Sequence, residues 1–262
     1  MAGAGFLLGV AVVAALTPWL APYSYAKTDL AYGARPPSSQ HPFGTDELGR
    51  DLLTRTMWGA RVSLAVGILA TAVSLAIGVS YGAVAGYLGG RADQLMMRLV
   101  DVLYGLPFMF FVIILMVVFG RNIVNLFIAL GAVQWLTMAR IVRGQVLSLK
   151  AREFVQAVRA LGAGPVFILA RHLVPNAAGP IIVYATLTVP AMMLEEAFLS
   201  FLGLGVQPPM ASWGSLASEG AAAMEPYPWL IVFPGIALTL TLFALNFLGD
   251  GLRDALDPQV GR

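Results

Sequence analysis

The sequence predicts an all-α membrane protein with six transmembrane helices, and three observations support that fold class. Of the 262 residues, 58% are hydrophobic and only 11% are charged, whereas a soluble domain carries about 25% charged residues. Six segments approach the roughly 20 apolar residues that a helix needs to cross a bilayer. The basic residues gather in the loops between these segments, which is typical of membrane topology.

The six predicted spans follow the apolar runs of the chain. They are residues 3–20, a stretch within 62–90, 103–120, 123–139, 176–194 and 229–248. The third and fourth are short and are joined by a tight turn, which predicts a helical hairpin and leaves a partly re-entrant pair open. The first run could instead be a signal peptide, but no basic residue precedes it and no clear cleavage site follows it, which favours a retained span.

The chain divides at residue 60. Residues 1–60 are predicted to hold the first span and an extracytoplasmic, interfacial segment, and residues 61–262 a domain of five helices. Residues 51–64 have the pattern of an amphipathic helix, which we expect to lie along the membrane interface.

The distribution of basic residues predicts the orientation of the spans. Six basic residues lie in the loop 140–175, and none lies in the loop 195–228. The six are Arg140, Arg143, Lys150, Arg152, Arg159 and Arg171. Because basic loops stay in the cytoplasm, the first loop is expected inside and the second outside, with both termini cytoplasmic. The loop 21–61 is an exception, since it is outside by alternation and carries five basic residues.

Composition excludes several kinds of chemistry. The absence of cysteine removes thiolate metal sites and thiol nucleophiles. The two histidines, His41 and His172, are predicted on opposite sides of the membrane, so we expect no metal centre. Neither lysine, Lys27 or Lys150, stands in a phosphate-binding loop, and the net charge of +2 does not favour nucleic acid. We therefore expect this chain to bind no cofactor and to have no catalytic residue.

Residues 78–82 match a serine nucleophile pattern around Ser80, but the match lies inside a predicted span with no histidine nearby. The glycines of this span point instead to helix packing. Gly78, Gly82 and Gly86 recur every four residues and so share one helix face. Small residues on such a face allow a second membrane helix to approach closely.

Two neighbouring acids, Glu195 and Glu196, stand at the predicted outer end of the fifth span. Ionisable groups at membrane depth often mark a substrate path. We consider a role in the substrate pathway and a purely structural role at the helix end equally supported.

The basic loop is expected to form a compact two-helix projection. Residues 148–161 have apolar side chains at helical spacing, namely Ala151, Phe154, Val155, Val158 and Leu161. Gly162 to Pro165 should end this helix, and residues 166–174 should form a second short one. Such a projection can fit a groove on a cytoplasmic partner; a helix resting on anionic lipid is the alternative.

This loop resembles the signature of the permease subunits of bacterial ABC importers, Glu-Ala-Ala, Gly and Ile-x-Leu-Pro at fixed spacing. Here it reads Gln156-Ala157-Val158, Gly162 and His172-Leu173-Val174-Pro175, with departures at 156, 158, 172 and 174. The resemblance implies that the loop 148–175 docks on an ATPase subunit. The residues that it assigns to this coupling are Glu153, Phe154, Gln156, Ala157, Arg159, Gly162 and Pro175.

Four further stretches are similar to the C-type permease of dipeptide and oligopeptide importers. They are residues 41–51, 199–205, 212–214 and 247–258. The resemblance implies a bacterial inner-membrane protein that works with a homologous second permease, two ATPase subunits that use ATP and Mg, and an extracytoplasmic solute-binding protein. It favours dipeptides or short oligopeptides as substrates and leaves nickel complexes, glutathione and haem open.

Two other functions remain alternatives at this point. A self-contained channel or secondary carrier would transport without ATPase subunits. An intramembrane hydrolase would use Ser80. The sparse intramembrane charge favours a transporter that is driven by another subunit over one driven by an ion gradient.

Overall fold

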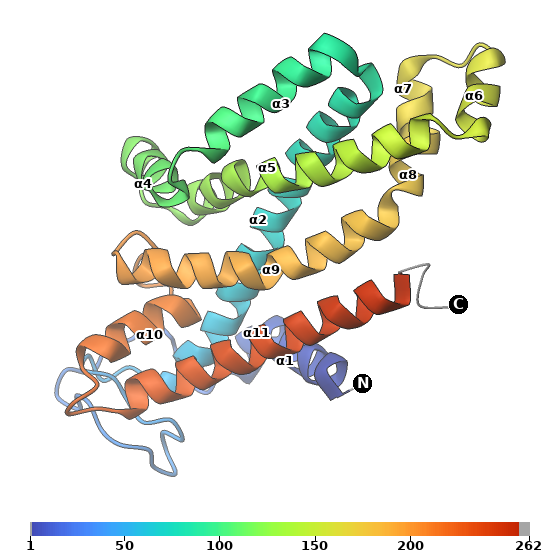
Figure 1. The fold of residues 1–262 in the computed structure, drawn as a ribbon. Helices are drawn as coiled ribbons and strands as arrows, with labels where there is room; N and C mark the ends of the chain where they lie inside the picture. Colours follow the sequence, from blue (N-terminus) through green and yellow to red (C-terminus); the bar gives the residue numbers. More distant parts are fainter. Residues whose placement is uncertain (1, 257–262) are drawn as a thin grey trace.

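The computed structural model describes residues 2–256, and its regular elements in that range are all helical (Figure 1). The longer helices are α1 (Ala2–Leu20), α2 (Leu52–Leu88), α3 (Gly90–Tyr104), α4 (Phe108–Phe119), α5 (Ile123–Lys150), α9 (Ala178–Phe201), α10 (Trp213–Ala222) and α11 (Trp229–Leu256). The short elements between α5 and α9 are α6 (Glu153–Ala160), α7 (Pro165–Ile168), one π-helical turn (Leu169–Leu173) and α8 (Val174–Asn176). The last residues of the stretch 247–258, including Pro258, lie outside the described part.

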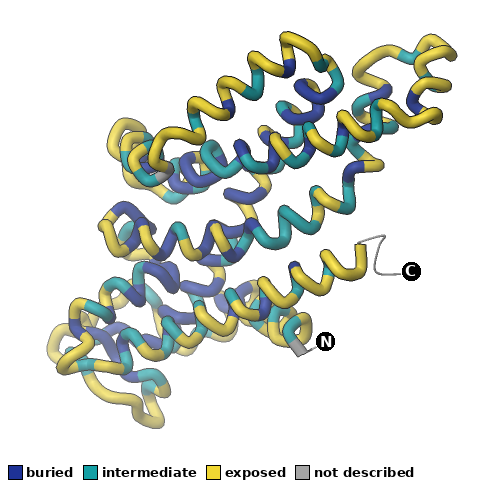
Figure 2. The backbone as a smooth tube through the Cα atoms, in the orientation of Figure 1, coloured by how far each residue is buried: buried dark blue, intermediate teal, exposed yellow. Residues whose placement is uncertain are grey.

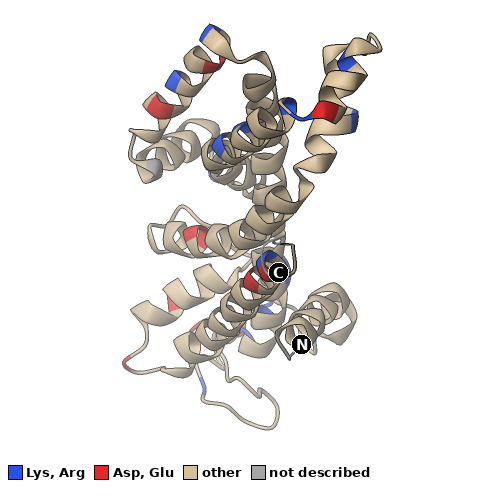
Figure 3. Cartoon of the chain, turned by 45° about the vertical axis from the view of Figure 1, so that its right-hand side comes forward, with Lys and Arg blue, Asp and Glu red and all other residues tan. Residues whose placement is uncertain are grey.

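The predicted fold class is confirmed. Among the described residues, α1, α2, α5, α9 and α11 are each long and apolar enough to cross a membrane. The bent pair α3–α4 makes a sixth span if it is counted as one. The charged side chains are sparse along most of these helices and gather on α3 and around α6 and α7 (Figure 3).

The third span, predicted over 103–120, is not a single helix in the structure. The chain bends by 85° between α3 and α4. Pro107 is the N-cap of α4, with an extended backbone, and a proline cannot continue the hydrogen-bond ladder of the helix before it. Residues 103–104 therefore end α3, and α4 keeps only 12 residues.

Helix α2 is one continuous helix of 37 residues, so the prediction of a separate interfacial helix over 51–64 was wrong. Asp51 caps the helix by accepting a hydrogen bond from the backbone N–H of Thr54 at 2.8 Å. The residues that follow, among them Leu52 and Arg55, are buried in the protein and do not face a membrane surface. The predicted division between residues 60 and 61 falls inside this helix.

The core lies where α2 passes α5 and α9 (Figures 1 and 2). Glycines on α2 take part in the closest of these contacts. A Cβ atom on Gly82 would stand 2.3 Å from the carbonyl oxygen of Ala139, and one on Gly78 would stand 2.6 Å from Cβ of Met138. A Cβ atom on Gly86 would approach the carbonyl oxygen of Arg143 to 2.9 Å. The backbones of α2 and α5 are thus in direct contact along this face.

The two ends of the bundle carry different structures (Figure 1). One end carries the loop 21–51 together with α10. The opposite end carries α6 and α7, and the start of α1 and the end of α11 lie toward it.

Candidate functional site

The segment from α6 to α8 is anchored by apolar side chains that reach into the bundle. Val155 of α6, Ile168 of α7 and Leu173 of the π-helical turn are fully buried. They belong to one cluster with Val142 and Val146 of α5. Burial of side chains of this size contributes about 1.5–3 kcal/mol each, so the segment is held firmly against α5.

The outer face of the same segment exposes large apolar side chains. Leu161 is 87% exposed and Val166 is 78% exposed. Phe154 and Phe167 are also exposed. Exposed apolar side chains grouped on one projection are typical of a protein interaction surface. We call these four residues the apolar tip.

This arrangement corrects part of the predicted amphipathic pattern. Phe154 and Leu161 belong to the predicted apolar face together with Val155 and Val158, but both are exposed. Val155 is buried and Val158 is partly buried, so they form the packed face. The face is displaced because α5 ends at Lys150 and α6 begins only at Glu153, which breaks the single helix that was predicted over 148–161.

Most residues assigned to coupling lie on the surface of this segment. Glu153 is the first residue of α6, and Ala157 and Arg159 are exposed along it. The side-chain amide of Gln156 donates to the carbonyl oxygen of Ala151 at 3.2 Å. Pro175 is exposed in α8.

Gly162 forms the turn between α6 and α7. Its φ angle is +86°, and a Cβ atom built there would meet nothing within 4 Å. Such a φ angle favours glycine over any other residue. The glycine is therefore favoured by the backbone of the turn and not by crowding.

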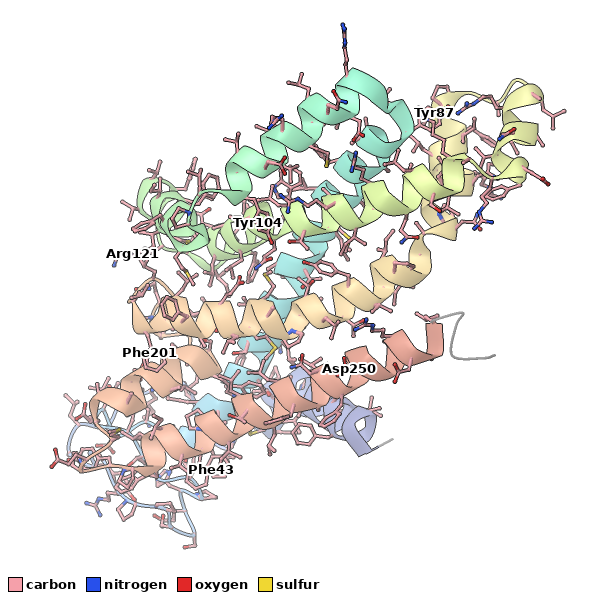
Figure 4. The ribbon with its side chains drawn as sticks, viewed as in Figure 1. Phe43, Tyr87, Tyr104, Arg121, Phe201 and Asp250 are labelled. Carbon is pink, nitrogen blue, oxygen red and sulfur yellow. The ribbon has the colours of Figure 1, made fainter. Side chains whose placement is uncertain are left out.

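A tyrosine at the end of α2 joins α2 to this segment. The ring of Tyr87 has Lys150 Nζ 5.5 Å and the Arg159 guanidinium 5.7 Å from its centroid. Lys150 also donates a hydrogen bond to the carbonyl oxygen of Tyr87. Figure 4 labels Tyr87 at this junction. The ends of α2 and α5 and the start of the projection are thereby tied together.

The two neighbouring acids lie inside α9, which continues to Phe201 beyond the predicted end of the span at 194. Glu196 is 1% exposed, and its Oε1 accepts hydrogen bonds from the hydroxyls of Ser200 at 2.8 Å and Ser212 at 2.7 Å. Ser212 is the N-cap of α10. Glu196 therefore fixes α10 against α9.

Glu195 has a different environment. The side-chain amide of Gln134 on α5 donates a hydrogen bond to its Oε1, whereas its Oε2 is buried and has no hydrogen-bond partner. Glu195 lines a cavity of about 290 Å³ between α3, α5 and α9. Of the two predicted pathway acids, Glu195 is thus the one at a cavity.

An ion-pair cluster lies at the end of the bundle that carries the loop 21–51 and α10, and it was not predicted. The Arg55 guanidinium, 1% exposed, donates to Asp46 Oδ2 and Glu219 Oε2, both at 2.7 Å. Arg50 also pairs with Asp46 at 2.7 Å. Because Asp46 lies in the loop 21–51 and Glu219 in α10, the cluster joins both to α2. The available sequence signal was Arg55, a basic residue within a helical run, but this signal did not identify its partners.

Ser80 is the residue that matches a serine nucleophile pattern. Its hydroxyl donates to the carbonyl oxygen of Ala76 at 2.7 Å on the exposed side of α2. Among the described residues, no three His, Asp or Glu side chains are placed to hold a metal ion.

Two family models match the chain. The model described as "Binding-protein-dependent transport system inner membrane component" matches residues 78–262. The model described as "N-terminal TM domain of oligopeptide transport permease C" matches residues 1–40.

Curated relatives are similar over nearly the whole chain. The oligopeptide transport system permease protein OppC of Haemophilus influenzae is 54% identical over 246 residues, which cover 93% of this chain and 79% of that protein. The dipeptide transport system permease protein DppC of Bacillus subtilis is 50% identical over 263 residues, which cover 100% and 82% respectively.

Solved structures share the fold at low sequence identity. An inward-facing conformation of the MetNI methionine ABC transporter matches with a TM-score of 0.61 and 19% identity, over 79% of this chain and 98% of that one. An amino acid ABC transporter matches with a TM-score of 0.57 and 15% identity, over 78% and 94%. The chain therefore belongs to the family of binding-protein-dependent transport system inner membrane components, as its sequence resemblance predicts, and is a multi-pass membrane permease subunit.

Proposed function

We propose that this chain forms half of the translocation pathway of an ATP-driven importer for dipeptides or short oligopeptides. The apolar tip supports the coupling part of this proposal, because four exposed apolar side chains on an anchored projection form a surface that a protein partner can cover. The substrate part rests on relatives named as oligopeptide and dipeptide permeases. Nickel complexes, glutathione and haem are the competing substrates.

The proposal assigns four kinds of partner. A homologous second permease completes the pathway, two ATPase subunits bind ATP and Mg, and an extracytoplasmic solute-binding protein delivers the substrate. Membrane lipid surrounds the spans. This chain itself binds no cofactor and no nucleic acid.

The orientation follows from the same assignment. The end with α6 and α7 faces the cytoplasm, together with both termini, and the end with the loop 21–51 and α10 faces outward. The basic residues near the apolar tip agree with this orientation.

The coupling step is mechanical in this scheme. Closure of the ATPase subunits on ATP displaces the apolar tip. The displacement reaches α5 through Val155, Ile168 and Leu173, which are buried against it, and reaches α2 through Tyr87. The translocation pathway then changes the side of the membrane to which it opens.

A matched pair of substitutions tests the coupling surface. Leu161→Glu places a charge on the apolar tip, and Leu30→Glu places one on a side chain that is 72% exposed at the other end. We expect Leu161→Glu to reduce both the ATP-hydrolysing activity that copurifies with the chain and ATP-dependent peptide uptake by at least about tenfold, since a charge at the centre of an interface is strongly unfavourable. Leu30→Glu should leave the copurified activity unchanged.

Two results would contradict the proposal. One is undiminished uptake and copurification with Leu161→Glu. The other is peptide transport in liposomes by this chain alone, which would favour the self-contained carrier.

A further inference from the structure

We propose that the cavity beside Glu195 binds a primary ammonium group, such as the amino terminus of a peptide, and that Glu195 is a specificity-determining residue. The inference deepens the proposed function and rests on it for the identity of the natural substrate. The existence of an ammonium site can be tested separately.

The cavity is formed where α3 ends beside α5 and α9. It is lined by Leu103, Tyr104, Leu106, Val133, Gln134, Leu136, Thr137 and Glu195. Its volume of about 290 Å³ equals that of roughly ten liquid waters at about 30 Å³ each. The terminal residue of a peptide fits in such a space. Figure 4 labels Tyr104, which forms one wall.

Only one of the two carboxyl oxygens of Glu195 has a hydrogen-bond partner. Gln134 donates to Oε1, but Oε2 is buried without a donor. A buried carboxylate oxygen without a donor is unfavourable, and a donor that enters the cavity beside Glu195 can relieve this cost once the side chain turns toward it. An alkylammonium group carries three donors, no acceptor and a positive charge, and thus supplies what Oε2 lacks.

The other polar groups of the cavity fit the same ligand. The hydroxyls of Tyr104 and Thr137 lie 3.3 Å apart, and each has oxygen lone pairs that can accept from an ammonium group. Arg140 lies 4.3 Å from the centroid of the Tyr104 ring but is paired with Asp101 at 2.9 Å. Glu195 is the one lining residue with a formal charge, so the cavity favours a cation.

The neighbouring Glu196 shows what a structural acid looks like in this helix. It is 1% exposed and accepts hydrogen bonds from two serine hydroxyls. It does not line the cavity that Glu195 lines. The two adjacent acids therefore have separate roles.

The absence of cysteine allows a direct test in membrane vesicles that hold the full chain. Val133→Cys places a single thiol in the cavity wall and keeps the hydroxyls of Tyr104 and Thr137. Its labelling rates by a trimethylammonium-ethyl and by a sulfonatoethyl methanethiosulfonate are compared. We expect Glu195→Gln to lower the ratio of cationic to anionic labelling at least about fivefold and Glu195→Asp to retain most of it, because the charge attracts the cationic reagent. Glu225→Gln, which changes an exposed acid, should leave the ratio unchanged.

Protection by a small ligand tests binding itself. We expect n-butylammonium to slow the labelling of the cavity thiol at least about threefold, n-butanol to have no effect, and Glu195→Gln to abolish the protection. A labelling ratio that Glu195→Gln leaves unchanged, or equal protection by the amine and the alcohol, would overturn the inference. If protection holds but the complete transporter imports no trialanine, the ammonium site stands and the peptide function fails.

Discussion

The guanidinium of Arg143 on α5 holds the carboxylate of Asp93 on α3 with two hydrogen bonds, Nε to Oδ1 at 2.5 Å and Nη2 to Oδ2 at 2.6 Å. Asp93 is 5% exposed, whereas a third of the Arg143 side chain is exposed. This two-point contact fixes the start of α3 against α5. It explains how a helix with several charged residues packs against an apolar bundle.

Removal of one partner should therefore weaken the fold. We expect Arg143→Ala to lower the free energy of unfolding by about 1–3 kcal/mol, less than for a fully buried pair because Arg143 is partly solvated. Arg143→Lys should recover only part of this loss, since an ammonium cannot make the planar two-point contact. Thermal unfolding of the purified chain in detergent measures both effects. A double-mutant cycle with Asp93→Ala that showed no coupling energy would refute the pairing.

The close contact of α2 and α5 predicts opposite effects for two glycine substitutions. Gly82→Ala places a Cβ atom 2.3 Å from the Ala139 carbonyl oxygen, so the helices must separate, at a cost of about 1–3 kcal/mol. At Gly144 a Cβ atom meets nothing within 4 Å, and Gly144→Ala should stabilise the helix by about 0.5–1 kcal/mol. Melting temperatures of the two variants should move in opposite directions; a shared direction would argue against backbone contact at Gly82.

The Arg55 cluster predicts that the loop 21–51 depends on one side chain. Arg55→Ala removes one of the two arginines that pair with Asp46 and leaves Arg50 as the other, so it should cost less than the roughly 3–5 kcal/mol of a fully broken buried pair, about 1–3 kcal/mol. Glu219→Gln should cost less, about 0–1 kcal/mol, because Glu219 is 42% exposed. Limited proteolysis should cut the loop 21–51 much faster in Arg55→Ala than in Glu219→Gln. Equal cutting rates would show that the cluster does not hold the loop.

The turn at Gly162 allows the effect of charge to be separated from that of shape. Asn and Asp are nearly isosteric, and both tolerate a positive φ angle. We expect Gly162→Asp to reduce transport at least about tenfold while the chain stays in the membrane, because the charge enters a docking surface. Gly162→Asn should retain most of the transport. The comparison requires ATP-dependent uptake together with membrane levels of each variant, and equal uptake by the two would count against docking at this turn.

The apolar runs predicted most of the spans, because lipid exposure leaves a signal in local composition. The failures share a different cause. The amphipathic pattern of residues 51–64 predicts a helix on the membrane surface, yet Arg55 is buried by carboxylates from the loop 21–51 and from α10. Glu219 lies 164 residues from Arg55, and a partner so distant leaves no trace in a local periodicity.

Helix α10 was missed for a related reason. Its cap pairs Ser212 with Ser215, whereas the usual sequence signature has Glu or Gln at the second position. Its cap is completed by Glu196, which the sequence placed at a helix end. The cavity at Glu195 likewise depends on Gln134 and on the end of α3, which only the assembled fold brings together.

The glycine face has a consequence for how the protein moves. Because Gly78 and Gly82 have no side chain, the backbone of α2 lies directly against the Met138 side chain and the Ala139 carbonyl group of α5, and the two helices cannot slide past each other without losing that fit. The two helices should therefore move together as one rigid unit. Bending is then expected where the packing is weaker, such as at the 85° bend between α3 and α4. The pathway should therefore open and close by movement at that bend.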